Sequence, residues 1–346
     1  MFFFGVEESS GSRDLAVGDA EYLLKFPLTN QQKIVSSQIQ KEALHQDVLV
    51  DAVCGAGKTE LVLETIKDAL LLQKKVGWAI PRRQVVLELK ERLAMMFPDL
   101  CVIAVCQGYT QITDGDLILC TTHQLYRYRA WFDLLILDEP DAFPYKGNSM
   151  LEHFANKSCV GNIIYLTATP DEHLLRRVEQ GEMSYVQLNA RPHGYPLIEP
   201  SVRIIPASLC LFLLYVKIQN ARQWLIFVPT RNIARWLSLI LRSDCITSES
   251  DQKEEIIERF RRKERRLLVA TTILERGVTF ADIDVVVLFS DHPIFDVASL
   301  IQISGRVGRS FLYPKGECLF LSRSKTSAVM SCIRKIRKAN QSVFGV

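Results

Sequence analysis

The sequence lacks any long apolar run. Across its 346 residues, no uninterrupted hydrophobic stretch approaches the ~20 residues that a membrane-spanning helix needs. The longest, Leu209–Val216, we expect to be buried in a protein core. The apolar start Met1–Phe4 is too short, and lacks the basic flank, for a secretory signal peptide. These features argue against a membrane-spanning or secreted chain.

The sequence also lacks cysteines at metal-ligand spacing. Its nine cysteines are scattered and include no C-x-x-C pair. Cys101 and Cys106 come closest, but they lie in or beside an apolar run and no second pair follows. We therefore expect buried, reduced thiols in a cytoplasmic protein and no zinc site.

Charge is unevenly distributed along the chain. Residues 201–346 carry 23 Lys and Arg against 13 Asp and Glu, whereas residues 1–200 carry 19 against 26. A basic second half is typical of a protein with a polyanionic partner, but a solvated helical face has the same composition. The basic stretches 259–266 and 334–338 account for much of the excess and leave both interpretations open.

The most informative segment is Val48–Thr59, in which an apolar strand leads into A-x-x-G-x-G-K-T. Glycines allow consecutive backbone N–H groups to turn inward as an anion nest, which the start of the following helix reinforces. Lys58 can then reach the β- and γ-phosphates of a nucleotide, and the Thr59 hydroxyl can bind Mg²⁺. Ala52 stands where such loops usually begin with glycine.

A second apolar strand, Leu134–Leu137, ends in the carboxylates of Asp138 and Glu139. The carboxyl ends of strands in a doubly wound sheet face the ligand crevice. That position suits Asp138 to hold Mg²⁺ and Glu139 to polarise an attacking water. The alternative is an acidic cap on the next helix.

Two further motifs follow. Thr167-Ala168-Thr169 ends another apolar strand, and its hydroxyls can hydrogen-bond Asp138 or Glu139 and sense the γ-phosphate, although an ordinary strand-to-loop transition has a similar sequence. The segment Gln302–Arg309 places Arg306 and Arg309 three residues apart among glycines. Arginine contacts phosphate oxygens bidentately and stays charged, so these two are candidate arginine fingers rather than members of a surface helix.

Apolar strands alternate with amphipathic helical segments along the whole chain. This pattern predicts an α/β protein with two mostly parallel sheets, each covered by helices on both faces. We expect a loose leader at 1–20, a first domain at 21–196 and a second at 197–346, with 191–196 as the linker. The expected strands are Val48–Val53, Val76–Ile80, Leu100–Val105, Asp116–Cys120, Leu134–Leu137, Ile163–Thr167, Trp224–Val228, Leu267–Thr271, Val285–Phe289 and Cys318–Leu321.

In this order and spacing, the motifs resemble those of the DEAD/DEAH-like helicase superfamily, from about residue 26 to 322. The resemblance implies two tandem RecA-like domains that bind ATP and Mg²⁺. It includes Leu28–Gln32, which looks like an adenine-reading element. The nucleotide-binding positions it implies are Gln32, Gly55, Ala56, Gly57, Lys58, Thr59, Glu60, Gly277 and Gln302; the catalytic ones are Lys58, Asp138, Glu139, Arg306 and Arg309. Thr59 and Asp138 would bind Mg²⁺, and Thr167 and Thr169 would couple the domains.

The phosphate loop with Glu60, and the acidic segment Asp138–Tyr145, are similar to those of the ComFA family of competence DNA translocases in Gram-positive bacteria. That resemblance implies a cytoplasmic ATPase, peripheral at the inner face of the membrane, that helps to pull single-stranded DNA through a channel. Its partners would be an accessory protein and the membrane channel, and a homo-oligomer is possible. Two features depart from the family: its N-terminal four-cysteine zinc module is absent from these residues, and Pro140 replaces the usual valine.

Polar residues at strand ends are candidates for nucleic-acid binding. Hydroxyls, backbone N–H groups and arginines there suit phosphate contacts, which give affinity without sequence specificity. Arg82 and Arg83 can instead be a solvated helix start, and His123 an ordinary loop residue. By the resemblance, the candidates are Pro81, Arg82, Arg83, Thr121, Thr122, His123, Thr230, Arg231, Thr271 and Thr272.

Three rival functions remain open from the sequence. An RNA helicase would share the same ATPase, although Gln302 replaces the histidine usual in DEAD-box RNA enzymes and the box has Pro140 instead of alanine. A nucleotide-gated scaffold would bind DNA without translocating. A motor subunit of a restriction or repair complex would need a nuclease on another chain.

Overall fold

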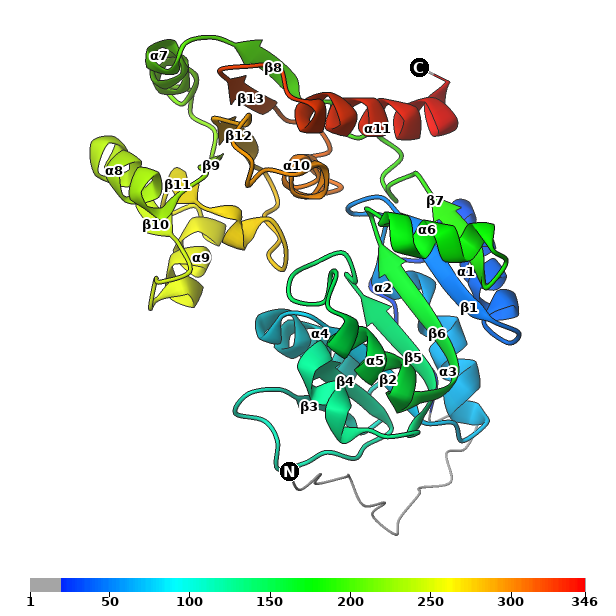
Figure 1. The fold of residues 1–346 in the computed structure, drawn as a ribbon. Coiled ribbons are helices and arrows are strands. Elements are labelled where there is room, and N and C mark those ends of the chain that lie inside the picture. The colour runs from blue at the N-terminus through cyan, green and yellow to red at the C-terminus, as the bar shows by residue number, and fades with distance from the viewer. Residues whose placement is uncertain (1–19, 346) are drawn as a thin grey trace. The chain divides into compact units, whose positions relative to one another are not determined.

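The computed structural model describes residues 20–345 and divides the chain into two compact units, which change over between Leu188 and Asn189 (Figure 1). Each unit is a parallel β-sheet with helices on both faces, which confirms the predicted fold class. Residues 1–19 of the expected leader lie outside the described residues. Residues 191–196, expected as a linker, lie within the second unit.

The sheet of the first unit has seven strands in the order β3-β4-β2-β5-β6-β1-β7, and every neighbouring pair is parallel. Its central strands are continuous apolar runs because both faces of a parallel sheet are covered. Edge strand β7 alternates buried and exposed residues and was not predicted. The strands are β1 (Asp47–Ala52), β2 (Val76–Ile80), β3 (Val102–Val105), β4 (Leu117–Thr121), β5 (Phe132–Asp138), β6 (Cys159–Thr167) and β7 (Met183–Leu188).

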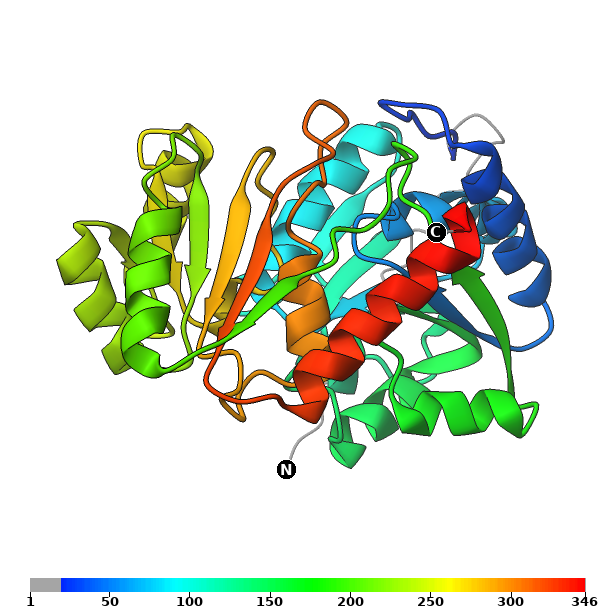
Figure 2. The same ribbon diagram turned by 90° about the horizontal axis from the view of Figure 1, so that it is seen from above.

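The helices of the first unit form two layers. One layer, of η1, α5 and α6, packs on the sheet through Leu125, Leu151 and Leu174, and α1, α3 and α4 cover the opposite face (Figure 2). Side-chain caps fix where several of these helices begin, since each satisfies an otherwise unpaired backbone N–H. The helices are α1 (Asn30–Glu42), α2 (Lys58–Leu61), α3 (Leu63–Leu71), α4 (Arg83–Met96), the 3₁₀ turn η1 (Thr122–Arg127), α5 (Ser149–Ser158) and α6 (Glu172–Glu179).

The second unit has six parallel strands in the order β10-β11-β9-β12-β13-β8. They are β8 (Ser201–Ile204), β9 (Trp224–Phe227), β10 (Asp244–Ile246), β11 (Leu267–Ala270), β12 (Asp284–Leu288) and β13 (Cys318–Ser322). The helices are α7 (Ala207–Lys217), α8 (Arg231–Leu241), α9 (Lys253–Arg261), the 3₁₀ turn η2 (Thr272–Leu274), α10 (Val297–Ser304) and α11 (Ser327–Phe344). The short strands β8 and β10 were not predicted.

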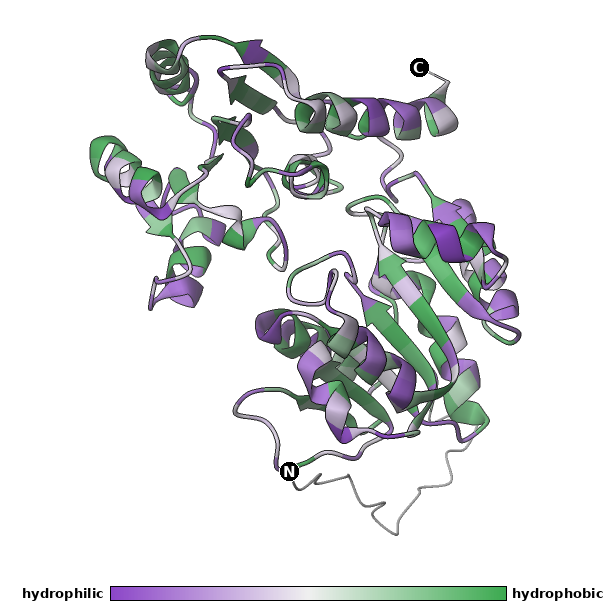
Figure 3. Cartoon of the chain, in the orientation of Figure 1, coloured by the Kyte–Doolittle hydropathy of each residue, from purple (hydrophilic) through white to green (hydrophobic). Residues whose placement is uncertain are grey.

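The single sheet of the second unit has an apolar core on each of its two faces. Helices α9, α10 and α11 pack on one face, around Phe260, Leu300 and Val329, whereas α7 and α8 cover the other through Leu214 and Leu237. Figure 3 shows the hydrophobic residues concentrated in the strands of both units. Burying one such side chain contributes roughly 1.5–3 kcal/mol, so these layers account for most of the stability.

Two expectations about burial were wrong. The run Leu209–Val216 forms most of helix α7 and buries only Cys210 and Leu214, leaving Phe212 61% exposed. A helix that covers a sheet buries one stripe only, whatever its composition. Of the nine cysteines, Cys101 is exposed and two others are half-buried. Among residues 20–345, no helix has both the length and the apolar character to cross a bilayer.

Candidate functional site

The glycine-containing loop joins β1 to α2 at the carboxyl edge of the first sheet. Gly55 and Gly57 adopt φ of +84° and +83°, the left-handed region in which glycine is favoured. A Cβ on Gly57 would lie 2.6 Å from Gln32 Nε2, so a larger residue there would displace the Gln32 side chain as well as strain the backbone. Lys58 begins α2, and its Nζ donates to the Ala52 carbonyl oxygen at 2.9 Å, across the loop. This backbone has the left-handed turns that an anion nest requires.

Gln32 connects helix α1 to this loop. Its Nε2 donates to the Ala56 carbonyl oxygen at 2.9 Å, and its Oε1 accepts from the backbone N–H of Thr29 at 3.0 Å. Thr29 in turn caps α1 by accepting from the Gln32 backbone N–H, which completes a capping box. Only 4% of Gln32 is exposed. Gln32, which the resemblance predicts to read adenine, therefore lies beside the phosphate loop. Glu60, next along α2, forms an ion pair with Arg92 of α4.

The two adjacent carboxylates lie at the carboxyl end of β5, two strands from the phosphate loop in the order β5-β6-β1. Loss of hydration and the neighbouring Glu139 carboxylate raise the pKa of Asp138 to about 7, while Lys58 opposes the shift. Glu139 adopts φ +54°, which is uncommon for a residue with a Cβ. A cation beside this carboxyl group favours its ionised form.

Thr167, the last residue of β6, and Thr169 contact a different carboxylate from the two that were predicted. Thr167 Oγ1 donates to Asp141 Oδ1 at 2.6 Å and Thr169 Oγ1 donates to Asp141 Oδ2 at 2.5 Å, so the expectation that they bond Asp138 or Glu139 was wrong. The reason is that the chain turns after Glu139 and brings Asp141, only 4% exposed, under the end of β6.

The residues at this edge fit a nucleotide triphosphate with Mg²⁺. The loop offers backbone N–H groups with the two glycine turns, Lys58 supplies a cation, and Thr59 with Asp138 supplies the oxygen ligands that Mg²⁺ prefers. Oxygen donors and a lysine are the chemistry of phosphate and magnesium, not of a soft metal.

Four of the candidate nucleic-acid positions of the first unit share one edge, because β2 and β4 are parallel neighbours. Pro81, Arg82 and Arg83 follow β2, and Thr121 ends β4, with His123 exposed in η1. Thr122, by contrast, is completely buried, so in this structure it offers no exposed atom to a ligand. Arg83 donates from Nε to the Gln107 carbonyl oxygen at 2.9 Å and lies over the Tyr109 ring.

In the second unit, the segment Gln302–Arg309, called the glycine–arginine segment below, lies against the loop that precedes β12. Arg306 is 1% exposed, and its Nε donates to the carbonyl oxygen of Glu275 at 3.2 Å. Gly277, two residues later, has φ +80°, and Gln302 is buried on α10. Arg309 Nε donates to the carbonyl oxygen of Gly305 at 2.7 Å. These candidate nucleotide contacts of the second unit therefore lie in one connected region.

The remaining candidates for nucleic-acid binding lie at the carboxyl ends of β9 and β11, which are parallel neighbours. Thr230 caps α8, and Thr271 and Thr272 lead into η2. Arg231 is already in an ion pair with Glu249, which also binds Arg235 at 2.6 Å. A phosphate at Arg231 would have to compete with this carboxylate.

Sequence reasoning missed two side chains of the second unit, Arg191 and His193, because a Pro- and Gly-rich stretch indicates only a break in the pattern. Both contact the glycine–arginine segment, with Arg191 donating to the Gly308 carbonyl oxygen at 2.7 Å. The one signal in the sequence was Arg191, a charged residue within the turn-forming stretch 191–196.

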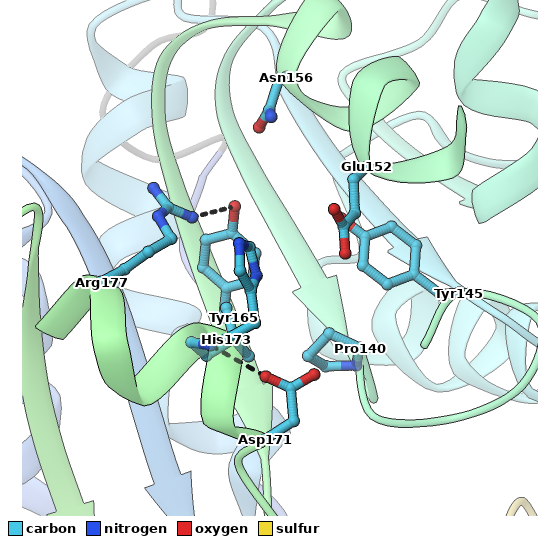
Figure 4. A pocket seen from close by; sticks show the side chains of 9 residues that line it. Pro140, Tyr145, Glu152, Asn156, Tyr165, Asp171, His173 and Arg177 are labelled. Atoms are coloured by element: carbon cyan, nitrogen blue, oxygen red, sulfur yellow. Dashed lines mark hydrogen bonds between the residues drawn. The ribbon is translucent and has the colours of Figure 1, made fainter. Parts of the chain in front are cut away.

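A separate small pocket of about 30 Å³ lies between α5 and α6 of the first unit (Figure 4). It is lined by Pro140 and by the rings of Tyr145 and Tyr165, and Arg177 donates to the Tyr165 hydroxyl at 3.1 Å. Burial raises the pKa of Tyr165 to about 12, so both partners keep their usual protons. This volume holds about one water molecule, so the pocket is too small for a nucleotide.

Comparisons with known proteins agree with this arrangement. The family model for the type III restriction enzyme res subunit matches residues 25–172, and that for the helicase conserved C-terminal domain matches residues 206–311. The S. cerevisiae protein Dbp5, solved with RNA and ADP BeF3, superposes with a TM-score of 0.64 at 16% identity, covering 90% of this chain and 91% of its own. RecG bound to a three-way DNA junction superposes with a TM-score of 0.63 at 19% identity, covering 90% and 45%. The fold is that of tandem RecA-like helicase domains.

Two relatives are similar over most of their length. Competence protein ComFA of Bacillus subtilis (strain 168) is 33% identical over 334 residues, covering 90% of this chain and 72% of that protein. The ComFA of Streptococcus pneumoniae (strain ATCC BAA-255 / R6) is 35% identical over 336 residues, covering 90% and 76%. The resemblance inferred from the phosphate loop and the acidic segment is thereby confirmed, and the chain belongs to the ComFA family within the superfamily 2 helicases.

Proposed function

We propose that this protein is an ATP-dependent translocase that moves along single-stranded DNA and drives the uptake of transforming DNA. The observation that carries the proposal is the carboxyl edge of the first sheet. There the phosphate loop with Lys58 follows β1, and the Asp138–Glu139 pair lies at the end of β5, two strands away. Membership of the ComFA family supports the DNA-uptake role, since both relatives are named competence proteins.

Each candidate residue has a role in hydrolysis under this proposal. The backbone N–H groups of residues 55–57 and the Lys58 ammonium bind the phosphates, while Thr59 and Asp138 hold Mg²⁺, which neutralises charge on the phosphate oxygens. Glu139 accepts a proton from the attacking water. Arg306 and Arg309 stabilise the charge that develops in the transition state. Gln32, Glu60, Gly277 and Gln302 make the remaining contacts with the nucleotide.

The DNA-binding part of the proposal rests on the strand ends of both sheets. Each sheet gathers polar residues from two parallel neighbours, around Arg82 and Thr121 in the first unit and around Thr230 and Thr271 in the second. Such residues contact phosphates and carry no base code, which suits a motor that accepts any sequence. Thr167 and Thr169, bonded to Asp141, link the acidic segment to the end of β6 and are the proposed coupling residues.

The proposal extends to the cellular setting. As a member of a competence family, the protein would act in the cytoplasm, at the inner face of the membrane, with a membrane DNA channel and an accessory protein as partners and as a homo-oligomer. Residues 21–196 are the proposed ATP-binding domain and 197–346 the proposed helicase C-terminal domain.

Displacement of streptavidin from the biotinylated end of an oligonucleotide tests translocation directly. We expect ATP-dependent displacement from single-stranded DNA by the wild type and none by Lys58→Ala, which lacks the phosphate-binding ammonium. Equal displacement from RNA would instead indicate an RNA motor. DNA binding without displacement, under conditions of ATP hydrolysis, would indicate a nucleotide-gated scaffold.

A further inference from the structure

Arg191 lies beneath the segment that carries the two candidate arginine fingers. It is only 3% exposed, and its guanidinium donates three hydrogen bonds to backbone carbonyl oxygens: Nη1 to Val307 at 2.8 Å and to Gly308 at 2.7 Å, and Nη2 to Gly305 at 3.1 Å. Helix α10 ends at Ser304 with Gly305 as its cap. The carbonyls that follow a helix end have no partner in the helix, so Arg191 supplies donors at the place where the fold needs them.

His193 holds the same turn from a second direction. Its Nδ1 accepts from the backbone N–H of Tyr195 at 3.1 Å, which places the ring hydrogen on Nε2. Nε2 then donates to the Gly308 carbonyl oxygen at 2.9 Å, the oxygen that Arg191 also binds. Burial, together with the charge of Arg191, lowers the pKa of His193, so the neutral ring persists at neutral pH.

The turn is also packed tightly. Gly308 adopts φ +66°, and a Cβ there would lie 2.5 Å from the Pro314 carbonyl oxygen and 3.4 Å from Arg191 Nη1. The backbone between Gly305 and Arg309 is therefore fixed from several sides, and Arg191 makes the largest number of its hydrogen bonds among the side chains named here.

The two candidate fingers extend from this fixed backbone. Arg309 Nε donates to the Gly305 carbonyl oxygen at 2.7 Å, the same oxygen that Arg191 Nη2 binds. Arg306 Nε donates to the Glu275 carbonyl oxygen at 3.2 Å. Arginines act on a transition state only when their position is set to within a fraction of an ångström, because small misplacements cost large factors in rate.

We propose that Arg191 is a positioning residue for ATP hydrolysis, which holds the backbone of Gly305–Arg309 so that Arg306 and Arg309 are presented correctly, with His193 as its support. This inference rests on the proposed function, in which those two arginines stabilise the transition state. Arg191 belongs to the second unit, whereas the phosphate loop belongs to the first. Replacing Arg191 therefore lowers kcat and leaves nucleotide affinity almost unchanged.

The test compares Arg191→Ala, Arg191→Lys, Arg306→Ala and the double variant Arg191→Ala/Arg306→Ala in steady-state ATPase assays. We expect Arg191→Ala to lower kcat by about 10- to 100-fold. We expect Arg191→Lys, which keeps the charge but not the planar fork, to lower kcat less. The double variant should be no slower than Arg306→Ala, because Arg191 acts only through the fingers. The dissociation constant of a non-hydrolysable ATP analogue should change less than threefold.

The matched control is Arg203→Ala, an exposed arginine of β8 that also donates to a backbone carbonyl, at 3.3 Å, and should keep wild-type kcat. Circular dichroism and thermal melting check folding. If Arg191→Ala does not fold, Arg191→Lys combined with Arg306→Ala completes the cycle.

Three outcomes would overturn the inference: unchanged kcat in a folded Arg191 variant, additive losses in the double variant, or a loss explained by nucleotide affinity. An inactive wild type would reject the proposed function itself. Wild-type kcat in a folded Arg191→Ala variant, while Arg306→Ala is inactive, would reject only this inference.

Discussion

The Thr169 hydroxyl donates a 2.5 Å hydrogen bond to Asp141 Oδ2 and so ties the end of β6 to the acidic segment that follows β5. Thr167 donates to the other oxygen of the same carboxylate at 2.6 Å. Because β6 lies between β5 and β1, this network sits between the acidic pair and the phosphate loop. Under the proposed coupling role of Thr167 and Thr169, a change at either place would be transmitted through Asp141.

Replacing Thr169 by valine keeps its shape and removes this hydrogen bond. Since Asp141 is 4% exposed, water cannot readily replace the lost donor, and we expect the free energy of unfolding of the first unit to fall by about 1–3 kcal/mol. We also expect weaker stimulation of the ATPase by DNA. Urea denaturation and ATPase assays measure the two effects, with the exposed Thr110→Val as control. Wild-type stability in Thr169→Val would show that the bond is unimportant.

Gln32→Ala removes the only hydrogen bond described here between helix α1 and the phosphate loop, that from Nε2 to Ala56. We expect nucleotide affinity to fall about five- to tenfold, because the variant loses the proposed contact of Gln32 with the base as well as the bond that orders the loop. Fluorescence titration with a labelled ATP analogue measures the change. Gln38→Ala, an exposed glutamine on the same helix, should bind normally. Equal affinities in the two variants would contradict this role of Gln32.

Glu249→Ala releases Arg231 and Arg235 from their shared ion pair. If Arg231 contacts DNA phosphates, the variant should bind single-stranded DNA more tightly, with a steeper dependence of affinity on salt, because more counterions are released. Fluorescence anisotropy at several salt concentrations measures both. The exposed Glu255→Ala on α9 removes one negative charge elsewhere and serves as control. An equal gain in both variants would mean that only net charge matters.

Gly308→Ala and Gly345→Ala separate backbone strain from steric clash. Both glycines adopt φ +66°, so alanine costs about 1 kcal/mol at each. At Gly345 a Cβ meets nothing within 4 Å, whereas at Gly308 it meets the Pro314 carbonyl oxygen at 2.5 Å. We expect only Gly308→Ala to lower kcat and to reduce the melting temperature markedly. Similar behaviour of the two variants would argue against a tightly packed turn at Gly308.

The pH dependence of stability reports on His193. Its pKa in the folded protein is lowered by burial below the ordinary value of 6.5, so the unfolded chain binds a proton more readily. The contribution of His193 to the free energy of unfolding does not change with pH above about pH 6.5. It becomes destabilising as the pH falls below that value. When the pH is lowered from 8 to 5, the melting temperature of the wild type should therefore fall more steeply than that of His193→Gln. Parallel curves would contradict the lowered pKa.

The sequence predicts this fold well where local patterns are strong. Apolar runs such as Val76–Ile80 match their strands, because a parallel strand buried on both faces must be continuously apolar. The same rule fails at sheet edges: β8 exposes half of its residues, and β10 has only three. Neither strand has an apolar run long enough to be predicted from the sequence.

Contacts between distant segments could not be predicted from local patterns. The choice of Asp141 as the partner of Thr169 depends on how the chain turns after Glu139. The contact of Arg191 with Gly308 joins residues more than a hundred positions apart. Motif spacing indicates which residues gather at a sheet edge, but not which oxygen each donor selects.

Steady-state ATPase activity with and without single-stranded DNA, for the wild type and Glu139→Gln, tests the central claim most directly. The amide keeps the size of the side chain and removes its ability to accept a proton from water. The account predicts strong stimulation of the wild type by single-stranded DNA and almost no hydrolysis by Glu139→Gln, with nucleotide binding retained. A wild-type rate that does not respond to DNA would contradict a DNA-driven motor.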